Sequence, residues 1–173
     1  NHPQMKCVIV SANFDSPTGS IMSERSRRRL VELCRRNSII IIEDDCYGSL
    51  NFEGFRPGTL FSIAPERTIY IAGLNFTHTK ELRIHWVCSQ IFTNELRYYH
   101  DMMNLAPPMH LRSAYAEMIN SNLTKKRRLD AGARCARTVD CVREAVYESF
   151  PDGTYVYNPS GGYSIWVKLP RGC

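Results

Sequence analysis

The chain has 173 residues, of which 43% are hydrophobic and 23% charged, and this length suits one domain or slightly more. That composition excludes a disordered or low-complexity chain. The net charge of +5 is too mild to indicate a nucleic-acid surface by itself. No apolar run approaches the roughly 20 residues that a membrane span needs, so we expect no membrane insertion, and the first residues do not resemble a signal peptide.

The cysteines favour a reducing compartment. Their number, seven, is odd, and no Cys-x-x-Cys pair occurs. Several lie within apolar runs, where a reduced, buried thiol is the common state. The five histidines show no metal-ligand spacing. The sequence therefore predicts a cytoplasmic protein without a disulfide framework and without a metal site.

The chain begins with a predicted strand, helix and strand. An apolar run predicts a buried strand over residues 5–11. Ser23 has the character of an N-cap, and the apolar spacing predicts a helix over residues 24–36. Four consecutive isoleucines predict a strand over residues 39–42. This succession indicates a βαβ unit and hence a parallel sheet. The predicted buried face of the helix consists of Leu30, Leu33 and Cys34.

The rest of the chain continues the alternation of strands and helices. A soft domain boundary is expected near residues 120–125, where the last long helix leaves the sheet layer. The remaining predicted elements are a loop over residues 51–65, strands over 68–73 and 84–89, helices over 93–105, 111–122 and 124–150, and a hairpin of 154–157 with 163–169.

Polar residues follow three of the predicted strands. They are the turn at residues 13–19, the segment 44–47, and the loop at 73–83. In a parallel sheet the carboxyl ends of the strands form one edge, and ligands bind in the crevice there. The sequence therefore predicts a site built from these three stretches.

The order and spacing of these segments resemble a known family. Glu43 to Gly48, Arg83 with Trp86, and the segment from Pro159 to Pro170 together resemble fold-type I pyridoxal-phosphate-dependent aminotransferases of class I and II. The resemblance is greatest to the aminotransferase-like domain of MocR-type regulators of the GntR family. It implies an α/β fold with a mostly parallel sheet and helices on both faces. By this resemblance residues 1–122 are the C-terminal half of the large domain, and residues 123–173 begin a small α+β domain.

The resemblance also assigns cofactor-binding positions. Asp44 stands where the family pairs a carboxylate with the protonated ring nitrogen, and Tyr47 where a phenol meets the phenolic oxygen of the cofactor. Arg83 stands at the phosphate-binding arginine. Ser16 occupies the place of an asparagine that binds the pyridoxal hydroxyl. A purely structural use of these residues, such as a solvated turn at Asp44 or an ion pair of Arg83, is the alternative.

The chain departs from the family at the decisive position. Phe76 stands where the family carries the lysine that forms a Schiff base with pyridoxal phosphate, and phenylalanine has no amine. Lys80 lies four residues further along, which is far for a group whose position must be accurate to about an ångström. Three nearby positions also depart from the family: Gly73, Glu81 and His85. We therefore predict no catalytic residue.

These observations predict an inactive aminotransferase-like domain that serves ligand sensing or dimerisation in a MocR/GntR-type transcription regulator. Pyridoxal phosphate, or an amino-acid-like molecule, is expected to bind noncovalently or not at all. The predicted partner is a second copy of the chain, and DNA is contacted only through a domain outside this chain. Two alternatives remain, an active aminotransferase that uses Lys80 and an architectural subunit of a larger assembly.

Overall fold

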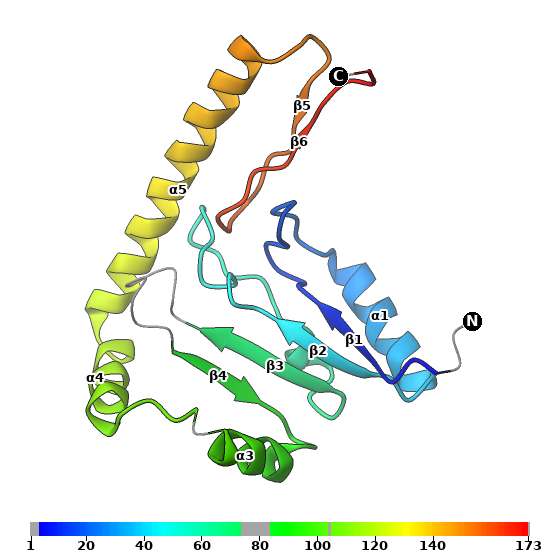
Figure 1. The fold of residues 1–173 in the computed structure, drawn as a ribbon, viewed down its shortest axis with the longest axis vertical. Helices are drawn as coiled ribbons and strands as arrows, with labels where there is room; N and C mark the ends of the chain where they lie inside the picture. The colour runs from blue at the N-terminus through cyan, green and yellow to red at the C-terminus, as the bar shows by residue number, and fades with distance from the viewer. Residues whose placement is uncertain (1–3, 74–83, 104, 173) are drawn as a thin grey trace.

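A computed structural model describes residues 4–73, 84–103 and 105–172. Its centre is a four-stranded sheet in the order β1-β2-β3-β4 (Figure 1). Its strands are β1 (Cys7–Val10), β2 (Ile40–Asp44), β3 (Thr68–Gly73) and β4 (His85–Cys88). The first three are parallel, with Ile42 beside Ile69, and β4 is antiparallel to β3. The predicted α/β fold with a mostly parallel sheet is confirmed.

Helix α1 (Glu24–Arg36) has the predicted bounds and cap. The Ser23 side chain accepts a hydrogen bond from the Ser26 N–H at 3.2 Å, as an N-cap does. The predicted buried face is partly wrong, because Leu33 is 56% exposed whereas Arg27 and Val31 are buried. Spacings of four and three residues place Arg27, Val31 and Cys34 on one stripe of the helix, and Leu33 lies off that stripe.

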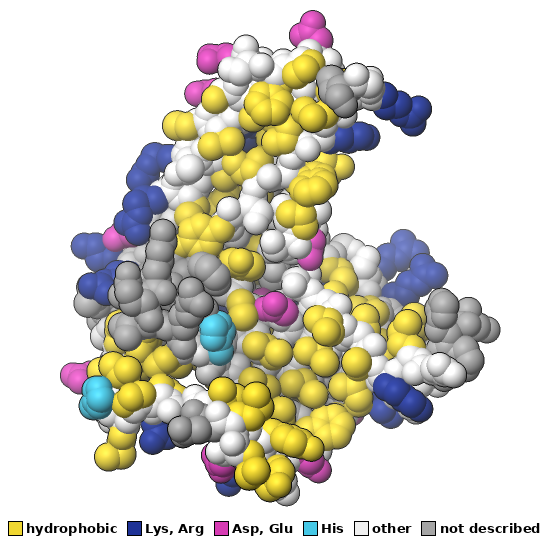
Figure 2. Space-filling model, in the orientation of Figure 1, with side chains coloured by type: hydrophobic (Ala, Val, Ile, Leu, Met, Phe, Trp, Pro, Cys, Tyr) yellow, Lys and Arg dark blue, Asp and Glu magenta, His cyan; other side chains and the backbone are white. Residues whose placement is uncertain are grey.

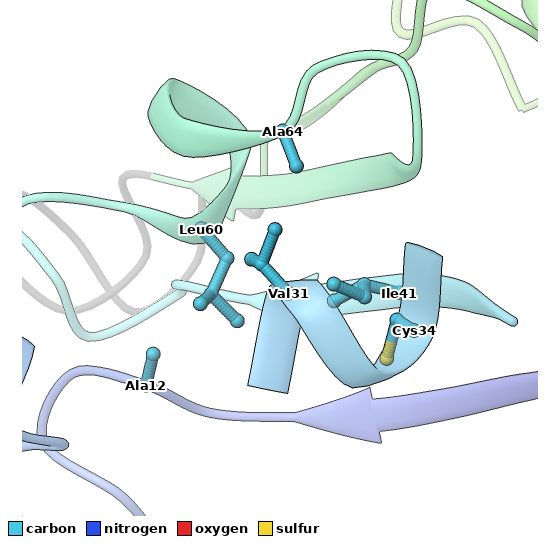
Figure 3. Packing of buried hydrophobic residues seen from close by; sticks show 6 residues of the cluster. All are labelled: Ala12, Val31, Cys34, Ile41, Leu60 and Ala64. Carbon is cyan, nitrogen blue, oxygen red and sulfur yellow. The ribbon is translucent and has the colours of Figure 1, made fainter. Parts of the chain in front are cut away.

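The hydrophobic core lies between the sheet, α1 and the short helix α2 (Leu60–Ile63). Figure 3 shows its side chains pointing toward one another from these elements. Helix α2 falls in the stretch predicted to be a loop, and it begins at Thr59, whose hydroxyl accepts from the Ser62 N–H. The core consists of Ala12, Val31, Cys34, Ile41, Leu60 and Ala64.

The opposite face of the sheet is open in the described part of the chain. Helices α1 and α2 both pack on the face that carries Ile41. On the other face Cys7 is exposed, Ile9 is 72% exposed and Val87 is 48% exposed. Figure 2 shows apolar side chains gathered over this face. The helices expected over both faces are thus found over one of them among the described residues.

The second half of the chain leads away from the sheet and returns to it. Helix α5 (Asn122–Ser149) rises from the sheet, and the hairpin at its end runs back toward β1 and β2 (Figure 1). The predicted hairpin is confirmed as an antiparallel pair, although its strands are shorter than expected. The proposed division at residue 122 stays a prediction. The other elements here are α3 (Thr93–Met102), α4 (Met109–Ile119), β5 (Tyr155–Val156) and β6 (Val167–Lys168).

Three features are absent from the described residues: a membrane-spanning helix, a metal-binding cluster and a disulfide. None of the described helices is both long and apolar enough to cross a membrane. No group of three metal-binding side chains occurs in the described ranges. The cysteines of those ranges are all free thiols.

Candidate functional site

The predicted site residues lie at the carboxyl ends of neighbouring parallel strands. Ser16 is in the turn that follows β1, Asp44 is the last residue of β2, and Tyr47 is three residues beyond it. Because β1 and β2 are parallel and paired, these residues belong to the same edge of the sheet. Arg83, Phe76 and Lys80 lie outside the described residues, so their predicted roles stay predictions.

Asp44 is half-buried and belongs to the open face of the sheet, since it alternates with the buried Glu43 and Asp45. Its Oδ1 accepts a hydrogen bond from the Cys46 N–H at 3.0 Å. The Cys46 side chain also interacts with this carboxylate. Burial first, and then interaction with Asp44, raises the pKa of the Cys46 thiol to about 12.

The C-terminal hairpin contacts both Ser16 and Tyr47. The hydroxyl oxygens of Ser16 and Ser164 are 3.5 Å apart, and the rings of Tyr47 and Tyr163 meet edge to face with centroids 6.3 Å apart. Backbone bonds reinforce these contacts, because the Gly162 N–H donates to the Leu50 carbonyl at 2.9 Å. Residues 160–164 therefore form one wall of the candidate site.

A buried carboxylate lies directly behind Asp44. Asp45 is 2% exposed, and its Oδ2 accepts hydrogen bonds from Arg56 Nη2 at 2.6 Å and from the Tyr70 hydroxyl at 2.8 Å. Its Oδ1 accepts from Asn13 Nδ2 at 3.0 Å. The carboxylate has close packing as well, because a Cβ at Gly48 would lie 2.1 Å from Oδ1. Asp45 therefore joins β2, the turn after β1, and the loop that carries Arg56.

Arg27 extends this network into helix α1. It is 2% exposed, and its Nη2 donates to Asn13 Oδ1 at 2.7 Å. Its Nη1 donates to the Gly58 carbonyl at 2.7 Å. Among the described residues no carboxylate lies within salt-bridge distance of Arg27, so the amide of Asn13 transmits its interaction to Asp45. Loss of a hydrogen-bond partner from a buried charge of this kind has a large cost in folding free energy.

Glu43 fixes the loop that leads from the segment after β2 to α2. It is fully buried, and its two carboxylate oxygens accept from the N–H groups of Leu60 and Phe61 at 2.7 and 2.9 Å. These are amide groups at the start of α2, which the helix itself cannot satisfy. Burial raises the pKa of Glu43, and the two N–H donors oppose that rise without cancelling it. The carboxylate thus anchors the end of the loop at residues 51–59.

The sequence prediction missed this polar network. Asn13 and Asp45 lie within the predicted site segments 13–19 and 44–47, but the sequence assigned them no role of their own, and Arg27, Arg56 and Tyr70 lie outside those segments. A weak signal existed, because an acidic residue follows Asp44 directly at the end of an apolar strand. Partners separated by 11 to 32 residues cannot be paired from spacing alone.

Pyridoxal phosphate, the cofactor that the family resemblance implies, can be tested against these residues. The half-buried Asp44 carboxylate at the strand end suits a protonated ring nitrogen. Tyr47 and Ser16 supply hydroxyl groups at the same strand ends. Phe76 offers no amine for a covalent bond. The side chains therefore fit a noncovalently held pyridine ring and do not fit a Schiff base at this position.

A separate cavity of about 720 Å³ lies between β4 and α3. Its lining is mainly apolar and includes Trp86, Leu96 and Met103. None of Ser16, Asp44 and Tyr47 lines it. It is therefore distinct from the strand-end site.

Comparison with known proteins places these features in a family context. The family model described as aminotransferase class I and II matches residues 1–81. An uncharacterized aminotransferase of Saccharolobus solfataricus is 29% identical over 99% of this chain and 43% of its own length. An uncharacterized HTH-type transcriptional regulator of Escherichia coli, YjiR, is 27% identical over 96% of this chain and 36% of its own length.

Comparison with solved structures agrees with the sequence matches. The crystal structure of Pyrococcus horikoshii kynurenine aminotransferase superposes with a TM-score of 0.87 at 25% identity, over 97% of this chain and 42% of that one. The chain thus spans about two fifths of the length of the relatives that it matches. The sequence matches and the shared fold together support the resemblance to a fold-type I, pyridoxal-phosphate aminotransferase-like domain, and this chain is similar to a portion of such proteins.

Proposed function

We propose that this chain binds a pyridoxal-phosphate-like or amino-acid-like ligand noncovalently and does not catalyse amino-group transfer. The observation that carries the proposal is Phe76 at the position of the cofactor lysine. Without an amine there, the covalent step of the family's chemistry has no nucleophile. The half-buried Asp44 carboxylate and the adjacent hydroxyls support retention of a ring at the strand ends.

We further propose that the domain serves in ligand sensing or dimerisation within a MocR/GntR-type transcription regulator. Similarity to YjiR supports this use, as does similarity to the regulator NorG of Staphylococcus aureus. DNA contact then belongs to a domain outside these residues, and a second copy of the chain is the expected partner. A cytoplasmic location agrees with the free thiols.

The second candidate is an active aminotransferase that uses Lys80. Similarity to the aminotransferases of Saccharolobus and Pyrococcus favours it. It requires Lys80 to replace a group four positions earlier in the chain. An architectural role without any ligand is the third possibility, and the binding experiment separates all three.

The experiment is titration of the protein with pyridoxal phosphate, followed through the fluorescence of Trp86 and Trp166. We expect saturable quenching that gel filtration reverses. After borohydride reduction, mass spectrometry should find no modification of Lys80 above that of exposed lysines such as Lys125. A reduced adduct confined to Lys80, together with transfer of an amino group from an amino acid to a 2-oxo acid, would establish the enzyme. Absence of any saturable binding would leave the architectural role.

A gain-of-function variant tests the site from the other direction. Phe76→Lys restores an amine at the family position, so we expect a borohydride-stable adduct at residue 76. The matched control is Phe76→Met, because the methionine side chain is similar in length to lysine and has no amine. If the lysine variant acquires no more adduct than the methionine variant, the match of Phe76 to the cofactor lysine is wrong.

A further inference from the structure

We propose that Asp45 is the positioning residue of the candidate ligand site: it holds the two strand-end segments in place without touching the ligand. The inference rests on the proposed function for its ligand, but the positioning itself can be measured without one. The neighbouring Asp44 belongs to the open face, where a ligand can reach it. Asp45 is buried on the other side of the same backbone.

The contacts of Asp45 join three separate segments. Asn13 belongs to the turn that carries Ser16, Asp45 to the segment that carries Asp44 and Tyr47, and Arg56 to the loop before α2. The Asp45 N–H donates to the Ile71 carbonyl at 2.8 Å, which fixes the backbone against β3. Removal of this carboxylate therefore releases the turn after β1 and the segment after β2 from each other.

The charge pattern explains why a carboxylate is needed. Arg56 Nη2 and the Tyr70 hydroxyl both donate to Oδ2, and Arg56 Nη2 also lies 2.6 Å from the Tyr70 oxygen. An amide at position 45 offers one acceptor oxygen, whereas its nitrogen faces the donor of Asn13 or of Arg56. A buried donor that loses its acceptor keeps the full penalty of its removal from water. Charge-assisted bonds of this kind are also the strongest available to the fold.

Rigid walls matter more here than in a covalent site. A Schiff base holds its cofactor by a bond, whereas a noncovalent site must supply affinity through groups that are already in place. Each wall that has to be ordered on binding reduces the affinity. The hydrogen bonds of Asp45 with Asn13 and Arg56 keep these walls ordered before a ligand binds.

The test is hydrogen–deuterium exchange of Asp45→Asn without ligand. The N–H groups of Asp15 and Gly19 are bonded within the turn, to Ser20 and Asp15 respectively. We expect peptides covering residues 11–22 to exchange about tenfold faster or more in the variant, since one lost bond shifts an opening equilibrium by that order. The matched control is Glu66→Gln, which removes a carboxylate from an exposed pair with Arg35 and should leave residues 11–22 unchanged.

A charge-preserving swap distinguishes positioning from general damage. In Asn13→Asp/Asp45→Asn the amide of residue 45 donates to the carboxylate of residue 13, which Arg27 also reaches, and the oxygen of residue 45 still accepts from Arg56. We expect this double variant to recover the protection of residues 11–22 that Asp45→Asn loses. If Asp45→Asn does not fold, Asn13→Ala provides the test instead. This variant removes the hydrogen bond from residue 13 to Asp45 and keeps those from Arg56 and Tyr70. We expect it to raise the exchange rate over residues 44–48.

Pyridoxal phosphate binding provides the second measurement. We expect Asp45→Asn to weaken the affinity about tenfold and the double variant to restore most of it. The positioning role is overturned if Asp45→Asn leaves the exchange of residues 11–22 unchanged. If Asn13→Ala has to replace that variant, the role is overturned by unchanged exchange over residues 44–48. Failure of the unsubstituted protein to bind pyridoxal phosphate overturns the proposed function instead and leaves the exchange result to decide the role of Asp45.

Discussion

Asn13 and Asp45 lie 32 residues apart and are joined by a hydrogen bond of 3.0 Å between Nδ2 and Oδ1. Both side chains are almost completely buried. The bond ties the turn after β1 to the segment after β2, and these are the two segments that carry Ser16, Asp44 and Tyr47. The geometry of the candidate site therefore depends on side chains that lie behind it.

Substitution of Gly48 should disturb this arrangement through packing alone. A Cβ at Gly48 would lie 2.1 Å from Asp45 Oδ1, so Gly48→Ala must displace the buried carboxylate. We expect the free energy of unfolding to fall by about 1–3 kcal/mol, the usual range for disruption of a buried polar network. Urea denaturation followed by circular dichroism measures it. Gly58→Ala is the control, because its Cβ would meet nothing within 4 Å. Equal losses for the two variants would contradict this account.

Glu43 should give the stability a pH dependence. Burial raises the pKa of its carboxyl above the ordinary 4.5, so the folded protein holds this proton more tightly than the unfolded chain. The resulting stabilisation is complete below pH 4.5 and is lost as the pH rises through the folded-state pKa. Glu43→Gln should be less stable, because its amide nitrogen cannot accept from the N–H of Leu60 or Phe61, and should lack this slope. Urea denaturation at a series of pH values measures it, and an unchanged slope in Glu43→Gln would count against the assignment.

The two faces of the sheet should respond differently to loss of an isoleucine. Ile41 is fully buried, and Ile41→Ala should cost about 2–5 kcal/mol. Ile9 is 72% exposed on the open face, and Ile9→Ala should change stability by no more than about 0.5 kcal/mol. Chemical denaturation of both variants compares the faces directly. A large loss for Ile9→Ala would mean that another surface covers this face in solution.

The thiol of Cys46 should be unreactive for a reason that involves Asp44. Its pKa is raised to about 12, so at pH 9.0 it remains almost entirely protonated, and the thiolate is the nucleophile. Alkylation with iodoacetamide, followed by peptide mapping, should modify the exposed Cys141 at least about tenfold faster than Cys46. Asp44→Asn should accelerate the reaction of Cys46 a few-fold by removing the neighbouring negative charge. If Cys46 reacts as fast as Cys141, the burial of the thiol is wrong.

Local patterns in the sequence determined most of the elements. The four consecutive isoleucines, the Ser23 cap and the β-branched run that begins at Thr68 each predicted an element that the structure contains. These signals are local, since capping and hydrophobic periodicity act within one or two turns of chain. The Phe76 departure is also readable in sequence alone, because the presence of an amine is a property of one side chain.

Only the tertiary structure decided which polar groups act together. Arg27 lies on a helix face that was predicted to be apolar, and α2 begins where Glu43 caps it from 17 residues away. The structure also decided that Asp44 belongs to the open face while Asp45 is buried, a difference that two adjacent aspartates do not reveal. The physical reason is that a buried charge is tolerated only where partners converge on it. Those partners come from segments that only the completed fold brings together.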